Sequence, residues 1–197
     1  MKRFTIIIVF TLFAMSTFGQ INIGVDVYNR YVWRGSDYGN TASIQPSLEY
    51  SIGGFTLGAW GAWAINGATG GNENDLFVST QVGPVEVTVT DYFFPEYMGT
   101  DSILDIESHI FEATAGIKLG PVNTLIAMNM AGDEENSAYL EFNYKVLTVG
   151  LGNGFYSTDG NFAPVNIGIS GEKDNLSVAY IINPNQETSF LVVGMSF

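Results

Sequence analysis

The chain has 197 residues, of which 20 are acidic and 7 are basic, and its formal net charge is −13. It contains no cysteine, which excludes a disulfide scaffold, a thiol nucleophile and a cysteine-ligated zinc site. The negative charge opposes a nucleic-acid partner, because phosphates are bound by a basic face. Charged residues make up only 14% of the chain, against about 25% in an average soluble domain. With 23 glycines and 14% aromatic residues, the composition predicts a single, folded, mostly β domain without a cofactor.

The first residues have the layout of a secretory signal peptide. Lys2-Arg3 is followed by an apolar run over residues 6–13 and by small residues up to Gly19. The alternative, a transmembrane anchor, is disfavoured because the apolar run falls short of the about 20 residues that a spanning helix needs. We predict a cleaved signal peptide over residues 1–19 and a mature domain over residues 20–197.

After this segment, apolar and polar residues alternate along the chain. From Ile21 to Arg34 the odd positions are mostly apolar and end in Tyr31 and Trp33, whereas the even positions are mostly polar. A period of two is typical of a β-strand with one apolar face, and the pattern recurs up to the C-terminus. It predicts 12 strands, over residues 21–34, 43–52, 55–65, 75–83, 85–94, 108–119, 122–131, 137–146, 147–157, 164–172, 175–183 and 187–197.

The connections between these strands alternate in length. Five are tight turns, such as Gly53-Gly54 and Gly83-Pro84, and six are longer polar loops. An even number of strands with short turns at one end is typical of barrels in the bacterial outer membrane. The sequence therefore predicts an all-β fold, a transmembrane antiparallel up-and-down β-barrel of about 12 strands in the bacterial cell outer membrane. The alternative is a soluble sandwich or a lipocalin-like barrel.

The last predicted strand, residues 187–197, ends in Phe197 and has apolar residues at alternate positions before it. It resembles the assembly signal of bacterial outer-membrane barrels. We therefore expect the barrel-assembly machinery to be a partner through this strand. Outer-membrane lipid and lipopolysaccharide are expected around the barrel.

The alternation also assigns side chains to the two faces of the barrel. A charge on the lipid face costs about 2–4 kcal/mol at the membrane midplane, so the charged residues of the strands are expected inside. They form either a constriction that selects solutes or salt-bridged contacts that stiffen the barrel. The predicted pore-lining residues are Asp26, Arg30, Arg34, Glu49, Glu86, Glu112, Lys118, Glu141, Lys145 and Glu172. Bulky residues share this inward parity, namely Tyr28, Trp60, Phe77, Tyr92, Phe94, Tyr139, Tyr156 and Phe190.

Other aromatic residues fall near strand ends, where a girdle at the membrane interface requires them. The predicted girdle residues are Tyr31, Trp33, Phe93, Tyr144, Phe155 and Phe197.

Several short motifs point to a family. The segment Tyr28-Asn29-Arg30-Tyr31-Val32-Trp33-Arg34-Gly35 is followed by Gln45-Pro46, Gly53-Gly54-Phe55 and Gly58-Ala59-Trp60-Gly61. This arrangement resembles the TorF-type family of small porins, over roughly the first third of the mature chain. The resemblance implies an outer-membrane barrel and a pore, and it implies no catalytic residues.

These observations favour a channel for passive diffusion of small polar solutes, with cations preferred because acidic residues predominate. The alternatives are a closed structural or surface-interaction barrel that acts through its acidic loops, and an outer-membrane lipid hydrolase. We expect no enzyme, because the single histidine, His109, has parity toward lipid and its neighbour Ser108 points to the opposite face. We also expect no metal site, since the acidic loops lack the spacing of a calcium-binding loop.

Overall fold

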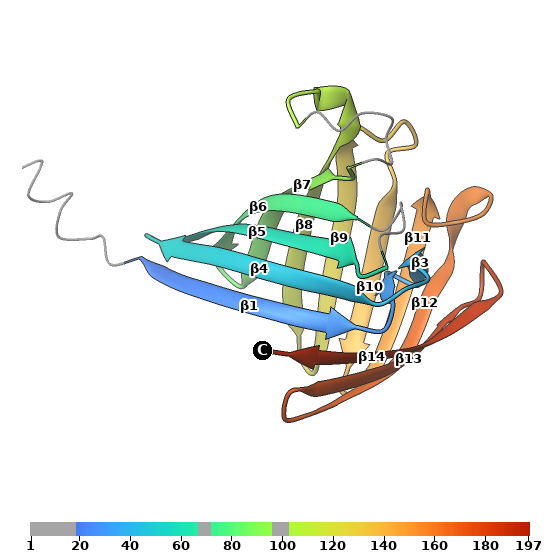
Figure 1. The fold of residues 1–197 in the computed structure, drawn as a ribbon. Helices are drawn as coiled ribbons and strands as arrows, with labels where there is room; N and C mark the ends of the chain where they lie inside the picture. The colour runs from blue at the N-terminus through green and yellow to red at the C-terminus, as the bar shows by residue number, and fades with distance from the viewer. Residues whose placement is uncertain (1–18, 67–71, 96–102) are drawn as a thin grey trace, which may run out of the picture.

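A computed structural model describes residues 19–66, 72–95 and 103–197. Twelve antiparallel strands form a closed β-barrel, which confirms the predicted all-β fold (Figure 1). The described residues contain one short 3-10 helix, η1 (Ile106–Ser108), and no α-helix. Within those ranges, no helix is long and apolar enough to cross a membrane. The barrel strands are β1 (Gln20–Tyr28), β4 (Ser43–Ile52), β5 (Phe55–Ala64), β6 (Glu73–Val82), β7 (Val85–Phe93), β8 (His109–Leu119), β9 (Val122–Ala131), β10 (Ala138–Tyr144), β11 (Leu147–Gly154), β12 (Gly160–Lys173), β13 (Leu176–Asn183) and β14 (Thr188–Ser196).

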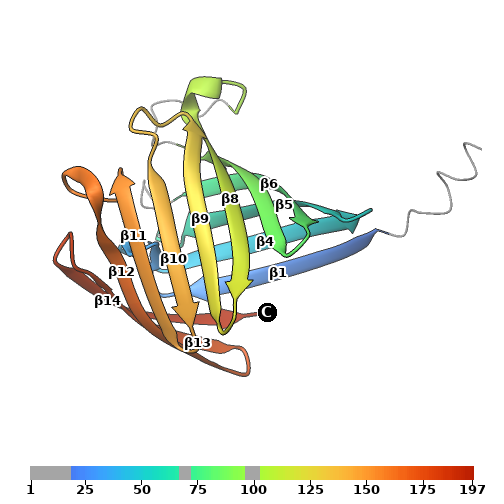
Figure 2. The same ribbon diagram turned by 180° about the vertical axis from the view of Figure 1, so that it is seen from behind.

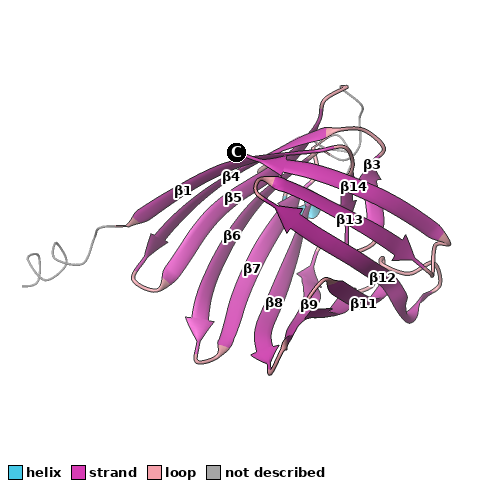
Figure 3. Ribbon diagram, turned by 90° about the horizontal axis from the view of Figure 1, so that it is seen from below, coloured by secondary structure: helices cyan, strands magenta, loops and turns pink. Residues whose placement is uncertain are grey.

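Neighbours along the chain are neighbours in the barrel, and β1 closes it by pairing with both β4 and β14 (Figure 2). Because all pairs are antiparallel, the tight turns lie at one end of the barrel and the longer connections at the other. Figure 3 shows the same strands around the barrel, with η1 drawn as a short helical turn. The predicted signal peptide lies outside the described residues, except for Gly19.

The closure between β1 and β14 is short. These strands pair only from Asp26 to Tyr28, whereas β1 pairs with β4 along its whole length. The side chain of Asn29 extends the seam, since its amide donates to the carbonyl of Leu191 at 3.1 Å and accepts from the amide of Val193 at 2.8 Å. Asn29 therefore continues the β1–β14 ladder after the strand has ended.

Apolar side chains cover the outside of the barrel. Ile23 is 76% exposed and Leu191 is 58% exposed, although both are large apolar residues. Polar residues alternate with them and point inward, so a polar interior is surrounded by an apolar exterior. This inverts the usual arrangement of a soluble domain, in which large apolar residues are mostly buried.

The first strand differs from the prediction. It ends at Tyr28 rather than at Arg34, and the chain then forms a separate hairpin of β2 (Tyr31–Trp33) and β3 (Ser36–Gly39). Arg34 and Gly35 make its turn with φ of 50° and 85°. At Gly35 an added Cβ would overlap the carbonyl oxygen of Val165 on β12, so only glycine fits. The alternation continues through residues 29–34, and periodicity alone could not reveal this reversal.

Candidate functional site in the barrel lumen

The hairpin β2–β3, hereafter the luminal hairpin, lies inside the barrel. On one wall Tyr31 donates to Glu73 on β6 at 2.7 Å, and Arg34 pairs with Glu112 on β8. On the opposite wall, Asn183 at the end of β13 donates to the carbonyl of Gly35 at 3.1 Å. Contacts to both walls mean that the luminal hairpin crosses the lumen.

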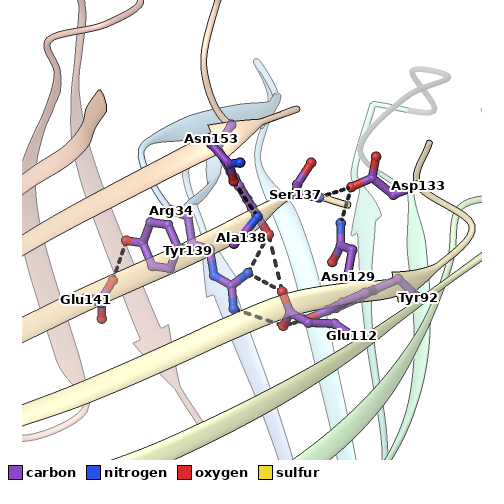
Figure 4. Close-up of polar contacts among 11 residues, drawn as sticks. Arg34, Tyr92, Glu112, Asn129, Asp133, Ser137, Ala138, Tyr139, Glu141 and Asn153 are labelled. Atoms are coloured by element: carbon purple, nitrogen blue, oxygen red, sulfur yellow. Dashed lines mark hydrogen bonds and ion pairs between the residues drawn. The ribbon is translucent and has the colours of Figure 1, made fainter. Parts of the chain in front are cut away.

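The strongest of these contacts is the buried ion pair of Arg34 and Glu112 (Figure 4). The guanidinium binds both carboxylate oxygens, with Nη2 at 2.9 Å from Oε1, and the two side chains are 8% and 1% exposed. Tyr92 donates to the same carboxylate at 2.9 Å, and Tyr156 does so at 3.3 Å. Because a buried charge left without its partner costs about 3–5 kcal/mol, each member of the pair holds the other in place.

Aromatic rings enclose this guanidinium. Its Cζ lies 4.1 Å from the ring centre of Trp33 and 4.7 Å from that of Tyr139. Cation–π contacts gain strength at buried sites, and the Arg34 side chain is only 8% exposed. The turn of the luminal hairpin is therefore fixed by one ion pair and by the rings around it.

A second polar network runs from Tyr139 toward the short-turn end. Tyr139 donates to Glu141 at 2.6 Å, and Asn143 donates to the other oxygen of the same carboxylate at 2.8 Å. Thr148 on β11 donates to Asn143 at 2.6 Å, and Asn166 on β12 donates to Tyr139 at 3.1 Å. These bonds join the inner faces of three adjacent strands and satisfy their polar groups.

At least two cavities remain in the lumen formed by the described residues. The larger, of about 540 Å³, lies against the luminal hairpin and is lined by Arg30, Tyr31, Trp60, Glu73, Asp75 and Glu172 among others. The smaller, of about 370 Å³, lies at the short-turn end and is lined by Glu86, Lys118, Glu141 and neighbouring residues. Acidic side chains outnumber basic ones on both, so each cavity favours cations.

The predicted pore-lining residues are distributed over this interior. Arg34 and Glu112 form the buried pair, Arg30 and Glu172 line the larger cavity, and Glu86, Lys118 and Glu141 line the smaller one. Asp26 and Glu49 alternate with exposed apolar residues of β1 and β4 and so face inward. Lys145 does not face the lumen, because it lies in the turn between β10 and β11 with φ of 55°.

The predicted girdle residues fall into three groups. Tyr31 and Trp33 lie in the lumen on the luminal hairpin, which corrects their placement at the membrane interface. Phe93 is buried and stacks on His109 at 5.1 Å between ring centres. Tyr144, Phe155 and Phe197 are exposed, at 41%, 47% and 72%.

Sequence reasoning missed Asp75 and placed Glu73 in a loop. Both lie on β6 and line the larger cavity. Asp75 was detectable in principle, because it shares the parity of Phe77, which was assigned to the lumen.

His109 has outward parity on β8, as predicted, because it pairs with Phe93 beside the inward-facing Tyr92, but it is only 5% exposed and so does not face lipid. Its Nδ1 lies 2.7 Å from Asp91, and its Nε2 lies 3.0 Å from the carbonyl of Ile103. A carbonyl oxygen only accepts, so Nε2 carries a proton here. Ser108 donates instead to the carbonyl of Asp105 at 2.8 Å and does not reach the imidazole.

The geometry thus defines a closed 12-stranded antiparallel barrel with a hairpin across its lumen. A family model described as "Bacterial protein of unknown function (Gcw_chp)" matches residues 14–181, and the chain belongs to this family. The match includes the luminal hairpin and most of the barrel. No curated protein matches the chain.

Proposed function

We propose that this barrel spans the bacterial outer membrane and lets small polar cations pass. The apolar exterior, the expected signal peptide and the resemblance to TorF-type porins support the location. Lipid and lipopolysaccharide would then contact the apolar exterior, and the C-terminal strand would engage the barrel-assembly machinery.

The observation that carries the channel function is the acidic, partly hollow lumen. Cavities of about 540 and 370 Å³ lie inside a ring of strands whose apolar faces point outward. Acidic inward side chains raise the local concentration of cations and repel anions. Preference for cations follows from this excess of negative charge.

The luminal hairpin controls the path in this proposal. It crosses the lumen between β6 and β8 on one side and β12 and β13 on the other. Solutes pass when the hairpin leaves this position. The pair of Arg34 and Glu112 keeps it there, so conduction occurs in brief openings rather than through a permanently open pore.

Single-channel recording of the refolded mature chain in a planar bilayer tests this function, with a salt gradient to measure selectivity. We expect rare, small, cation-selective steps. The Glu112→Gln variant should open more often because Arg34 loses its charged partner, and Glu86→Gln should shift the reversal potential toward zero. Asp174→Asn, a matched change in an exposed turn, should leave both quantities unchanged.

A closed barrel that acts through its acidic loops is the second candidate, and the luminal hairpin itself favours it. Silence from a correctly folded, heat-modifiable barrel, including the Glu112→Gln variant, would refute the channel and leave this alternative as the favoured function. We further propose that the chain is not an enzyme. In support, the single histidine hydrogen-bonds through Nε2 to a backbone carbonyl instead of a hydroxyl nucleophile.

A further inference from the structure

We propose that the larger cavity is a binding site for small organic ammonium ions, in which Asp75 binds the charged group. One carboxylate oxygen of Asp75, Oδ1, is buried and has no hydrogen-bond partner. The residue is only 6% exposed and lines the cavity. Burying a carboxylate oxygen without a hydrogen-bond donor costs free energy. A ligand that donates a hydrogen bond to this oxygen would therefore gain binding free energy.

The charges around Asp75 favour a cation. Glu73 lies two residues away on the same face of β6, and the two carboxyl groups interact. Carboxylates so close together repel unless a proton or a cation lies between them. Among the described residues, no ion pair is formed with either of them. Arg30, the basic residue on this cavity, is instead engaged by Asp37 at 3.4 Å and by Asn40.

The walls favour an organic ion over a bare metal ion. Figure 1 shows β6 between β5 and β7. Asp75 on β6 is directly opposite Trp60 on β5 and Tyr92 on β7, so an aromatic residue flanks it on each neighbouring strand. The luminal hairpin adds two more rings, because Tyr31 packs on Trp60 at 5.5 Å and Trp33 packs on Tyr92 at 5.6 Å.

Aromatic faces attract organic cations and bury their carbon atoms. The volume of about 540 Å³ lies in the range of sites that hold small molecules. We find no group of three or more metal-ligating side chains among the described residues, in keeping with an organic occupant.

The test uses the refolded mature barrel in detergent and three ligands of one shape. These are phenethylammonium, the uncharged phenethyl alcohol and the anionic 3-phenylpropionate, titrated by calorimetry and by tryptophan fluorescence. Two of the three tryptophans, Trp33 and Trp60, line the cavity and report on binding. We expect saturable binding of the ammonium, at least tenfold weaker binding of the alcohol and none of the anion.

Variants locate the site. Asp75→Asn should weaken phenethylammonium binding about ten- to a hundredfold, because it removes the charge but keeps the shape. Asp174→Asn, an exposed turn residue whose left-handed φ of 56° asparagine tolerates, should bind as the wild type does. Heat-modifiability and circular dichroism verify folding. If Asp75→Asn fails to fold, the comparison of the three ligands on the wild-type barrel still decides the matter.

Three outcomes would overturn the proposal. Equal affinity for the ammonium and the alcohol would mean that charge is not recognised. Undiminished binding by Asp75→Asn would place the ligand elsewhere. Binding of Na⁺ or Ca²⁺ without any binding of the ammonium would assign the carboxyl pair to metal ions. Because binding is measured at equilibrium in detergent, the result does not depend on whether the barrel conducts.

Discussion

Replacing Gly35 with alanine should expel the luminal hairpin from the lumen and leave the barrel folded. The new Cβ would overlap the carbonyl oxygen of Val165, a fully buried residue of β12. Overpacking of this kind costs about 1–3 kcal/mol. The left-handed φ of 85° adds about 1–2 kcal/mol for any residue with a Cβ. The docked hairpin thus loses about 2–5 kcal/mol, whereas the strands of the barrel lose none of their hydrogen bonds.

Gly53→Ala provides the matched control. Gly53 also has a left-handed φ, of 58°, but no atom lies within 4 Å of its added Cβ. It therefore places a Cβ at a left-handed glycine without the overlap, and because it lies in the turn between β4 and β5 it leaves the docking of the hairpin unchanged. The two variants thus differ by the full cost of about 2–5 kcal/mol, or about 30- to 5000-fold in the docked population.

Trypsin measures this difference, because Arg34 is a cleavage site that is held by Glu112 when the hairpin is docked. Cleavage after Arg34 should be faster in Gly35→Ala than in Gly53→Ala by that factor. Equal rates, with both barrels still heat-modifiable, would refute the docking geometry.

Three further predictions concern single side chains. Asn29→Ala removes two hydrogen bonds at the seam and should lower stability by about 1–2 kcal/mol, seen as a lower urea midpoint; an unchanged midpoint would mean that the seam does not limit stability. Tyr92→Phe removes a donor to buried Glu112 and should cost about 1–2 kcal/mol in the same assay, whereas an effect below 0.5 kcal/mol would show that water replaces it. Burial by itself would raise the pKa of Asp133, but hydrogen bonds from Ser137 and its neighbours lower the pKa below the usual aspartate range. The hydrogen bonds to the ionised Asp133 carboxylate therefore stabilise the folded state above the usual aspartate range. This stabilisation is lost as the pH falls through the lowered pKa of Asp133. Hydrogen exchange at the Ser137 amide should lose protection there, and Asp133→Asn should abolish this pH dependence.

The barrel could be predicted from sequence because the information is local. Alternation with a period of two reports on each strand separately, and Gly or Pro residues mark three of the five tight turns, at 53–54, 83–84 and 120–121. The 12 strands and the apolar exterior follow from these signals without any knowledge of which strands meet. Even the inward parity of Trp60 and Tyr92, which line the larger cavity, could be read in this way.

The luminal hairpin could not be predicted, because its causes are not local. Tyr31 and Trp33 continue the alternation of β1, and an aromatic pair near a strand end fits an interfacial girdle as well as a lumen. What decides between them is the partner of Arg34, which is Glu112, 78 residues further along the chain. The local signal of a reversal in this segment is the glycine at position 35, which lies in the turn with φ of 85°.

The luminal hairpin links the two proposals, and this link can be measured. Tyr31 and Trp33 complete the aromatic walls around Asp75 only while the hairpin is docked. A ligand that binds the docked state better must stabilise that state, and the coupling is reciprocal. Phenethylammonium should therefore lower the frequency of channel openings in the wild type, with half of the effect near its dissociation constant. Gly35→Ala should bind it more weakly and conduct more often. An ammonium ion that binds with undiminished affinity to Gly35→Ala, while that variant opens freely, would show that the hairpin forms no part of the site.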